Sequence, residues 1–280
     1  MLIFNRPTAL SSHLGSLPNK SIGLVPTMGA LHKGHLSLLE ESLKNNLHTV
    51  ISIFVNPTQF NNSEDLEKYP RTFESDIEMV KSLSESIIVF APNVDDVYNG
   101  KTVSEHFNFD GLENQMEGKF RQGHFDGVAT IVKRLFDIVK PDRAYFGEKD
   151  FQQLQIVKKL VSKYNLAVEI IACPIYREEN GLAMSSRNER LTPKQKQLAA
   201  VIFATLKSAK TKFTRESASK VTEYVKQTFR ENPDFKLEYF EIAEEDTLQP
   251  FIRKNKEKKY RAFIAVFADK IRLIDTIALN

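Results

Sequence analysis

The feature that most constrains the fold is a nearly continuous run of β-branched and apolar residues, 49–55, which ends at the turn Asn56–Pro57. A run of this kind predicts a parallel strand covered on both faces, because a half-exposed strand would alternate apolar and polar residues. Other short apolar runs that lead into turn signals are 22–25, 87–90, 143–146 and 168–175. We therefore expect an α/β domain built on a parallel sheet.

The stretch 26–35 joins the earliest of these runs to a helix that begins near Leu36. Gly29 and Gly34 let the backbone approach a ligand, and the helix N-terminus presents N–H groups and a positive dipole end to an anion such as phosphate. The glycine spacing matches a Walker A loop, but His35 and Leu36 stand where Lys and Ser or Thr are required. The stretch therefore predicts a nucleotide-binding turn of another type.

Two histidines in this stretch, His32 and His35, are three residues apart, so both imidazoles can face the same bound phosphates. The spacing alone leaves two alternatives open, solvated surface residues or a pair of zinc ligands, although no Cys, His or acidic cluster nearby completes a zinc site. The pattern His-x-Gly-His after a strand and a Pro-Thr-Met-Gly turn resembles the signature of the HIGH-type nucleotidylyltransferases. These enzymes bind ATP and transfer its AMP part.

Polar side chains also follow two other predicted strands. Asn56 and Gln59 can offer amide hydrogen bonds to a polar substrate beyond a strand end, although an ordinary Asn-Pro turn explains them equally well. The turn 147–150 follows another strand, and Lys149 within it is placed to neutralise phosphate charge. This turn precedes a helix that Asp150 can cap.

Helical periodicity and capping residues predict further elements. Asp150 and Gln153 form a capping-box pattern, and Thr192 forms another with Gln195. The segment 104–120 is ambiguous and is interpreted as a strand through Phe109 followed by a short helix. The other helices and strands that we expect are helices from about 72 to 83, 123–139 and 218–230, and strands 237–242, 262–267 and 271–274.

A polar, turn-rich segment at 177–181 predicts a domain boundary, with an α/β domain at 1–176 and a small α+β lid domain at 177–280. Directly after it, the loop 184–188 contains two serines and Arg187. Hydroxyls, backbone donors and a guanidinium group suit a mobile phosphate clamp, but the same residues occur in many ordinary loops.

Charge and cysteine content narrow the functional classes. The chain has 280 residues, and its 39 basic and 36 acidic side chains are interspersed and sum to +3, which gives little support to binding of nucleic acid or membranes. A single cysteine, Cys173, excludes an internal disulfide. The absence of a leader pattern and of a long apolar segment predicts a cytoplasmic protein.

Taken together, these stretches resemble the pantothenate synthetases, the pantoate–β-alanine ligases of the HIGH-type nucleotidylyltransferase superfamily. The resemblance covers most of the chain, and its specificity comes from the ordered set of motifs more than from any single one. The matching segments are 25–35, 54–60, 69–72, 123–125, 146–153 and 185–188.

The resemblance implies a Rossmann-like N-terminal domain, Mg²⁺-ATP as the nucleotide and a homodimer. It implies an ATP-dependent ligase that joins pantoate to β-alanine through a pantoyl-adenylate and releases AMP and pyrophosphate. Two alternatives are another HIGH-type adenylyltransferase and a nucleotide-binding module without catalysis. Pyrophosphate exchange that depends on pantoate would separate these alternatives.

The resemblance also assigns residues to roles. Catalysis is assigned to His32, His35, Lys149, Ser185, Ser186 and Arg187. The ATP site is assigned to Met28, Gly29, Ala30, Leu31, His32, Lys33, Gly34, His35, Gly147, Glu148, Lys149, Asp150, Tyr176, Met184, Ser185, Ser186 and Arg187. The substrate site is assigned to Asn56, Gln59, Arg121 and Gln153.

A possible metal ligand and one unusual acidic residue complete the set. Some relatives have an acidic residue where Ser75 stands here, next to Asp76. Because Ser75 lacks that acidic group, the triphosphate would supply most of the Mg²⁺ coordination, and Asp76 is the remaining candidate for a protein ligand. Asp126 follows the motif 123–125, and the sequence gives no physical account of it.

Overall fold

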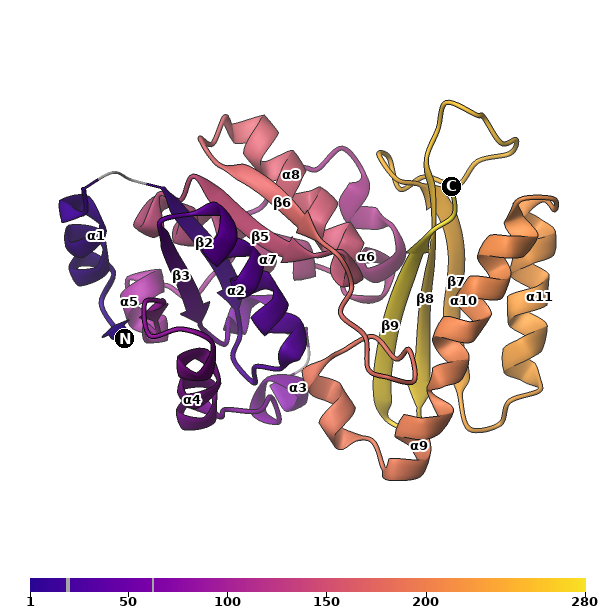
Figure 1. Cartoon of the computed structure of the whole chain (residues 1–280). Coiled ribbons are helices and arrows are strands. Elements are labelled where there is room, and N and C mark those ends of the chain that lie inside the picture. Colours follow the sequence, from indigo (N-terminus) through magenta and orange to yellow (C-terminus); the bar gives the residue numbers. More distant parts are fainter. Residues whose placement is uncertain (19–20, 62) are drawn as a thin grey trace. The chain divides into compact units, whose positions relative to one another are not determined.

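The computed structural model describes residues 1–18, 21–61 and 63–280. These residues form two compact units, each with its own sheet (Figure 1). The first unit consists of Met1–Glu113, Glu117–Gly147 and Gln153–Pro174, and the second of Asn114–Met116, Glu148–Gln152 and Ile175–Asn280. The division predicted at 176/177 did not include the two short segments that the N-terminal part of the chain contributes to the second unit.

A parallel sheet organises the first unit, as the apolar runs predicted. Within the described residues it has six strands in the order β1-β4-β3-β2-β5-β6, and every neighbouring pair is parallel. Its strands are β1 (Leu2–Phe4), β2 (Ile22–Thr27), β3 (His48–Ile53), β4 (Ile88–Phe90), β5 (Arg143–Gly147) and β6 (Glu169–Cys173). The strand order reverses between β2 and β5, and ligands in such sheets bind beyond the carboxyl ends of the strands at this switch point.

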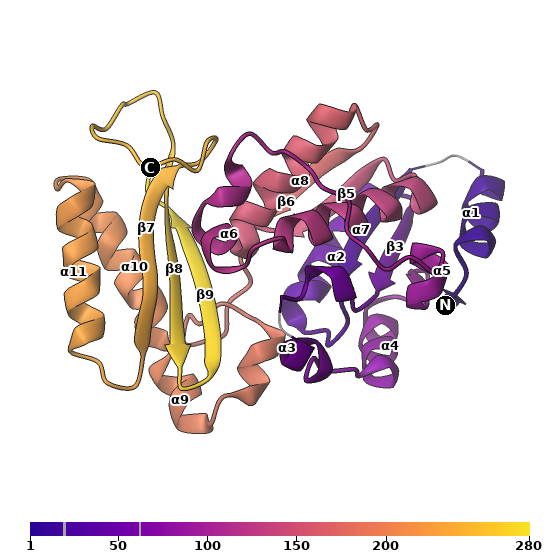
Figure 2. The same ribbon diagram turned by 180° about the vertical axis from the view of Figure 1, so that it is seen from behind.

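Helices cover both faces of this sheet, and alternate residues of each strand point to opposite sides. Val25, Ile51 and Val89 pack with α2 and α4, whereas their neighbours Leu24 and Val50 are buried on the other face, which α7 covers (Figures 1 and 2). The helices are α1 (Pro7–Ser16), α2 (Lys33–Asn45), α3 (Ser63–Glu67), α4 (Phe73–Leu83), α5 (Val94–Tyr98), α6 (Met116–Phe120), α7 (His124–Val139) and α8 (Phe151–Tyr164). The predicted Rossmann-like architecture is confirmed.

The segment before α6 differs from the prediction. Residues 104–109 form no strand, although Phe107 and Phe109 are both buried as alternation predicts. The backbone N–H groups of Glu105, Phe107 and Phe109 donate to side chains instead of to a neighbouring strand. The segment therefore has the burial pattern of a strand without a strand partner.

The start of α8 also differs from the prediction. Asp150 is the last residue of a 3₁₀ turn, Glu148–Asp150, which runs directly into α8. An N-cap residue has extended backbone, so the predicted capping box of Asp150 and Gln153 does not begin this helix. The box of Thr192 and Gln195 is confirmed at the start of α9.

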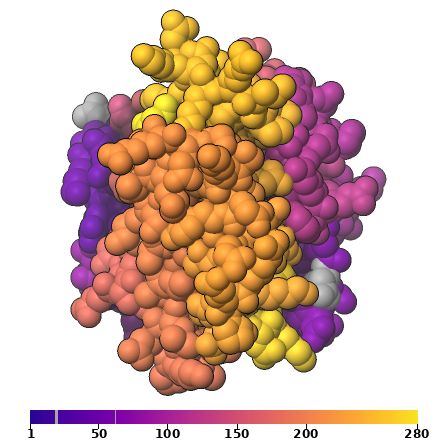
Figure 3. Space-filling view, turned by 90° about the vertical axis from the view of Figure 1, so that its right-hand side faces the viewer, coloured from indigo at the N-terminus to yellow at the C-terminus, as the bar shows by residue number. Residues whose placement is uncertain are grey.

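An antiparallel sheet with helices on one face forms the second unit, which confirms the predicted small α+β domain. In the described residues its strands are β7 (Lys236–Glu244), β8 (Tyr260–Ala268) and β9 (Ile271–Ala278), in that order. Its helices are α9 (Pro193–Leu198), α10 (Ala200–Phe213) and α11 (Ala218–Arg230). Figure 3 looks onto α10 and α11, drawn in orange.

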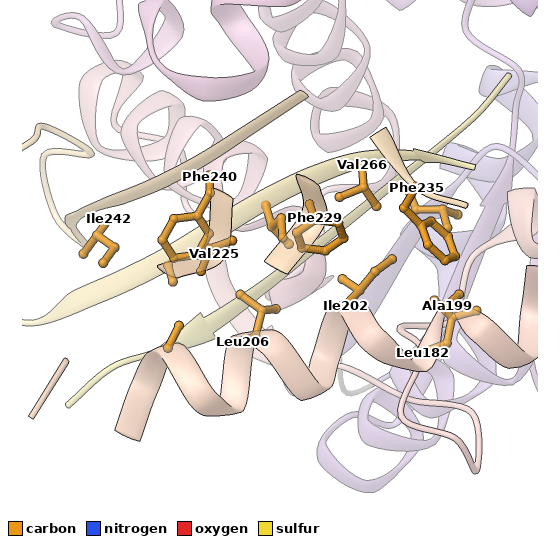
Figure 4. Close-up of a cluster of buried hydrophobic side chains, with 14 of the residues drawn as sticks. Leu182, Ala199, Ile202, Leu206, Val225, Phe229, Phe235, Phe240, Ile242 and Val266 are labelled. Carbon is orange, nitrogen blue, oxygen red and sulfur yellow. The ribbon is translucent and has the colours of Figure 1, made fainter. Parts of the chain in front are cut away.

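The core of this unit lies between the sheet and α10 and α11. Ile202 and Leu206 of α10 and Val225 and Phe229 of α11 pack against apolar side chains of the strands, such as Phe240 (Figure 4). These helical residues recur at intervals of four, which places them on one face of each helix. Nowhere in the described chain is a helix long and apolar enough to cross a membrane.

Candidate active site

The loop that leaves β2 at the switch point contains two consecutive residues with left-handed backbone. Gly29 has a φ of +79° and Ala30 a φ of +49°; glycine adopts this conformation readily, whereas it costs alanine about 1–2 kcal/mol. The Thr27 hydroxyl accepts a hydrogen bond from the Gly29 N–H at 3.3 Å and donates one to the Ser52 carbonyl of β3 at 2.6 Å. The sheet therefore fixes the start of this loop.

The two histidines cap α2 with their own side chains. Nδ1 of His32 accepts a hydrogen bond from the Gly34 N–H at 3.1 Å, and Nδ1 of His35 accepts one from the His32 N–H at 3.3 Å. The rings stack with centroids 4.0 Å apart. A nitrogen that accepts must present a lone pair, so a neutral imidazole in either residue carries its hydrogen on Nε2. The pair therefore holds two N–H donors on stacked rings, an arrangement suited to phosphate oxygens.

A buried amide, Asn56, lies beyond the end of β3 and is only 1% exposed. Its Nδ2 donates to Oε1 of Gln59 and to the carbonyl of Gly127, both at 3.1 Å. Its Oδ1 accepts hydrogen bonds from Thr58 at 3.1 Å and from Tyr98 at 2.5 Å. Asn56 was predicted as a substrate contact. Its amide forms hydrogen bonds within the protein, and the bond to Gln59 orients that side chain.

The amide of Gln59 is oriented by neighbours on both sides. Its Oε1 accepts from Asn56, and its Nε2 donates to the sulfur of Met28 at 2.8 Å. His124 Nδ1 lies 2.8 Å from the Gln59 carbonyl oxygen and donates to it. A thioether sulfur is a weak acceptor, so an oxygen of a substrate would be a stronger partner for this amide. The contact with Met28 joins the predicted ATP loop to a predicted pantoate residue.

Tyr98 and His124 were not predicted from the sequence, and Tyr98 lies 42 residues from its partner Asn56. Burial raises the pKa of the Tyr98 phenol, and hydrogen bonds to Thr58 and Asn56 oppose this rise. A tyrosine at this distance in the chain carries no local signal, and only the folded structure brings it to the amide.

Asp126, which the sequence left unexplained, has a structural role. Its Oδ1 accepts from the Phe107 N–H at 3.0 Å, and its Oδ2 lies 2.9 Å from Nδ1 of His106. The hydrogen bond to Asp126 raises the pKa of the exposed His106. Asp126 therefore attaches the irregular segment before α6 to the start of α7.

In the second unit, the turn that contains Lys149 is held by a buried arginine on β8. Arg261 is 4% exposed, and its guanidinium lies 3.3 Å from the Glu148 carboxylate and 2.8 Å from the Glu245 carboxylate. It also stacks on the ring of Phe151 at 3.9 Å. Arg261 thus attaches Glu148 and Phe151, which lie on either side of Lys149 in the chain, to the antiparallel sheet.

The predicted clamp loop is the end of a tight hairpin in the same unit. The Met184 N–H donates to the Tyr176 carbonyl at 2.9 Å, and Ser185 caps a 3₁₀ turn, Ser186–Arg190, by accepting from the Arg187 N–H at 3.3 Å. The next residue, Asn188, is 1% exposed and donates to Glu178 at 2.7 Å and to the Ala183 carbonyl at 3.1 Å. The hydroxyls and Arg187 are therefore half-buried on an ordered turn.

An ion pair holds the base of this hairpin. Arg177 forms two hydrogen bonds with the Asp275 carboxylate of β9, at 2.6 and 3.0 Å, and stacks on Phe203 at 3.6 Å. Burial raises the pKa of the Asp275 carboxyl, against opposing effects of its hydrogen bonds to Arg177 and of the charge of Lys149. The hairpin and the turn of Lys149 therefore both attach to this sheet.

The other predicted residues have simpler surroundings. Lys33 is exposed at the first position of α2, Gln153 is half-buried on α8, and Arg121 lies 4.0 Å from Glu117. Asp76, the candidate Mg²⁺ ligand, is buried and accepts hydrogen bonds from the loop 30–31. In the part of the chain that the structure describes, no group of three or more His, Cys, Asp or Glu side chains could hold a metal ion.

Comparison with known proteins gives consistent matches along the chain. The family model described as pantoate-beta-alanine ligase matches residues 3–278. The pantothenate synthetase of Flavobacterium psychrophilum is 60% identical over 282 residues, with complete coverage of both chains. That of Christiangramia forsetii is 56% identical and covers 93% of this chain and 92% of its own.

Solved structures of the same family have this fold. The pantothenate synthetase from Thermus thermophilus superposes with a TM-score of 0.92 at 36% identity, covering 100% of this chain and 99% of its own. The pantoate-beta-alanine ligase from Francisella tularensis, solved in complex with beta-gamma ATP and beta-alanine, has a TM-score of 0.80 at 34% identity, with 100% and 98% coverage. This chain therefore belongs to the pantoate–β-alanine ligase family.

Proposed function

We propose that this chain condenses pantoate with β-alanine to form pantothenate, in an ATP-dependent reaction that proceeds through pantoyl-adenylate and releases AMP and pyrophosphate. One observation carries the proposal: a pantothenate synthetase matches the whole chain at 60% identity. In the first step the pantoate carboxylate attacks the α-phosphorus of ATP and pyrophosphate leaves. In the second step the amine of β-alanine attacks the acyl carbon and AMP leaves.

The residues of the β2 loop suit the first step. A pantoate carboxylate is ionised at pH 7 and needs no general base, so the protein has to orient the substrates and stabilise charge on the phosphates. The Nε2–H groups of His32 and His35 fit this need, and Lys149 and Arg187 add positive charge. We assign the ATP site to residues 28–35, 147–150, Tyr176 and 184–187.

Pantoate is assigned to the amide side of the loop. Gln59 presents Nε2 to a weak acceptor, the Met28 sulfur, and this geometry favours its exchange for a hydroxyl or carboxylate oxygen of pantoate. Gln153 and Arg121 are the further substrate contacts that we propose. Asn56 acts in this proposal by fixing the amide of Gln59.

Mg²⁺ is proposed to enter with ATP. The buried Asp76 carboxylate accepts three hydrogen bonds from its own chain, so it does not fit the role of an open metal ligand. The oxygens of the triphosphate are suitable ligands for Mg²⁺, which is commonly bound through substrate phosphates. We also propose a homodimer in the cytoplasm, on the strength of the family resemblance.

The test is an assay of the purified protein with ATP, pantoate and β-alanine. We expect pantothenate and AMP in equal amounts, and exchange of labelled pyrophosphate into ATP that requires pantoate. Exchange without pantoate, or AMP release that does not respond to β-alanine, would instead favour another HIGH-type adenylyltransferase. Binding of ATP without any turnover would favour a nucleotide-binding module.

A further inference from the structure

Asp76 of α4 connects two parts of the first unit that lie far apart in the sequence. Its Oδ2 accepts a hydrogen bond from the Ala30 N–H at 3.0 Å, and its Oδ1 accepts one from the Leu31 N–H at 2.8 Å. Thr72 donates its hydroxyl to Oδ1 at 3.1 Å. The side chain is 2% exposed, so three hydrogen bonds satisfy a charge that would otherwise be buried without compensation.

The backbone that Asp76 holds is one that the chain does not adopt by itself. Gly29 and Ala30 are both left-handed, and alanine is unfavourable in this conformation. Two charge-assisted hydrogen bonds to adjacent N–H groups favour this geometry over relaxed alternatives. Leu31 is followed directly by His32, the N-cap of α2, so the position of the carboxylate determines where the helix and its two histidines begin.

The same geometry limits what the loop offers to a nucleotide. The N–H groups of Ala30 and Leu31 point to the carboxylate, and those of Gly34 and His32 point to imidazole nitrogens. These four amides are therefore engaged within the protein, two by Asp76 of α4 and two by the histidines of the loop. Phosphate contacts at these four positions would therefore come from side chains, and the two imidazoles are the donors that the loop holds there.

From these contacts we propose that Asp76 is a positioning residue, and not a metal ligand, which holds the loop 29–31 so that His32 and His35 present their Nε2–H groups together. The effect on catalysis rests on the proposed function. The effect on the loop does not, because it follows from hydrogen bonds present without any substrate.

The test replaces the carboxylate without changing its size. In Asp76→Asn the amide can accept from one backbone N–H but places its own N–H₂ against the other, so the loop should open more often. We expect hydrogen exchange at the Ala30 and Leu31 amides, measured by NMR without ligands, to accelerate about tenfold or more. Exposed Glu78 lies on the same helix, and Glu78→Gln should leave both amides unchanged.

Kinetics distinguishes a positioning role of the Asp76 carboxylate from a role as a metal ligand. For a positioning residue, Asp76→Asn should slow pantoate-dependent pyrophosphate exchange while the Mg²⁺ concentration at half-maximal rate stays constant. A shifted Mg²⁺ midpoint with unchanged amide exchange would overturn the proposal in favour of metal binding. If the protein had no ligase activity at all, the amide measurement would still decide the proposal.

A milder variant covers the case in which Asp76→Asn fails to fold. Thr72→Val removes one of the three hydrogen bonds and leaves the carboxylate in place. It should accelerate exchange at Leu31, whose N–H shares Oδ1 with Thr72, more than at Ala30, which donates to Oδ2. Equal or absent acceleration at the two amides would contradict the proposed anchor.

Discussion

At the scale of single residues, the histidine pair has two roles that one substitution would remove together. The His35 ring accepts the hydrogen bond that begins α2, and it carries the N–H that we assign to the phosphates. Loss of a cap costs about 1 kcal/mol of stability, whereas loss of one preorganised donor slows a reaction by about 10²- to 10³-fold. The first effect is measured as a free energy of unfolding and the second as a reaction rate, so denaturation and kinetics can separate them.

We expect His35→Ala to slow pantoate-dependent pyrophosphate exchange by about 10²- to 10³-fold, and His32→Ala to have a comparable or milder effect. The reaction of preformed pantoyl-adenylate with β-alanine should fall far less, because no pyrophosphate leaves in that step. His106→Ala, at an exposed histidine outside the site, is the matched control. Equal losses in both steps would indicate general disruption of the loop.

A second residue prediction concerns pantoate. Gln59→Ala and Gln153→Ala should each raise the KM for pantoate about tenfold or more, because a hydrogen bond to a charged group contributes roughly 1.5 kcal/mol. Gln59→Glu keeps the acceptor for Asn56 but opposes a carboxylate, so its KM should rise further. Gln227→Ala, at an exposed glutamine of α11, is the control. If the KM for pantoate were the same in all four variants, the assignment would be wrong.

Local patterns identified the strand–loop–helix at 26–35 and the residues that follow strand ends, because periodicity and turn chemistry act over a few residues. They could not reveal the role of Asp76, which lies 45 residues from Leu31, or of Tyr98, which completes the surroundings of Asn56. The position of Asn56 beyond a strand end predicted a substrate contact, which stays a prediction. The same local pattern could not reveal that its amide also bonds to Gln59 and Gly127.

At the scale of elements, α7 packs unusually closely against the turn that carries Gln59. A Cβ atom added to Gly127 would lie 2.3 Å from the carbonyl oxygen of Thr58 and 2.7 Å from Cα of Gln59. Real Cβ atoms do not approach backbone so closely, so any side chain at this position has to displace the turn. The close contact at Gly127 therefore fixes how near α7 can lie to the turn that carries Gln59.

Gly127→Ala should destabilise the protein by about 1–3 kcal/mol, the usual cost of overpacking, and raise the KM for pantoate. Gly15→Ala is the matched control because a Cβ there meets nothing within 4 Å and the residue lies in α1. It should stabilise by about 0.5–1 kcal/mol. Chemical denaturation and pantoate kinetics check both variants. If Gly127→Ala changed neither the stability nor the KM for pantoate, the turn would have relaxed without cost.

The hairpin of the second unit permits a test of the clamp. An ATP analogue should slow hydrogen exchange at Ser185, Ser186 and Arg187 by about tenfold if these residues close on the nucleotide and exclude water. Amides in the middle of α11 serve as the internal control and should not respond. Equal exchange rates with and without the analogue would indicate that this turn is an ordinary loop and not a clamp.

The irregular segment before α6 shows why a correct pattern can predict the wrong element. Phe107 and Phe109 alternate with polar residues, and both are buried as a strand would bury them. The side chains of Asp126, Thr130 and Glu113 accept the N–H groups that a strand would donate to its neighbour. Alternation of apolar and polar residues indicates that one face of a segment is buried. Whether the segment pairs as a strand depends on residues elsewhere in the chain.

At the scale of the whole molecule, the division at 176/177 predicted from turn composition differs from the two compact units, because the second unit also includes Asn114–Met116 and Glu148–Gln152. The segment Glu148–Gln152 belongs to the second unit, where Phe151 is 5% exposed and Arg261 contacts Glu148. A contiguous N-terminal piece would keep this segment without its partners. Composition reveals where a linker is polar, but not which short segments cross to another unit.

We therefore expect a fragment of residues 1–176 to unfold at lower denaturant concentration than the full chain, or to aggregate, and to bind the apolar dye ANS. Co-expression with a fragment of residues 177–280 should reduce dye binding, because Phe151 regains its contacts. Gel filtration and urea denaturation measure both outcomes. A monodisperse 1–176 fragment with the stability of the full chain would contradict this expectation.

The contacts of Arg261 also bear on how such a chain can be recombined. A chimera that takes its C-terminal part from a relative receives β8 from one parent and the turn of Lys149 from the other. The residue at position 261 would then come from one parent, and its partners at positions 148 and 151 would come from the other. These positions lie 113 and 110 residues away from Arg261 in the chain. Inheritance of the C-terminal unit therefore requires two segments that lie within the N-terminal sequence, 114–116 and 148–152, to be exchanged with it.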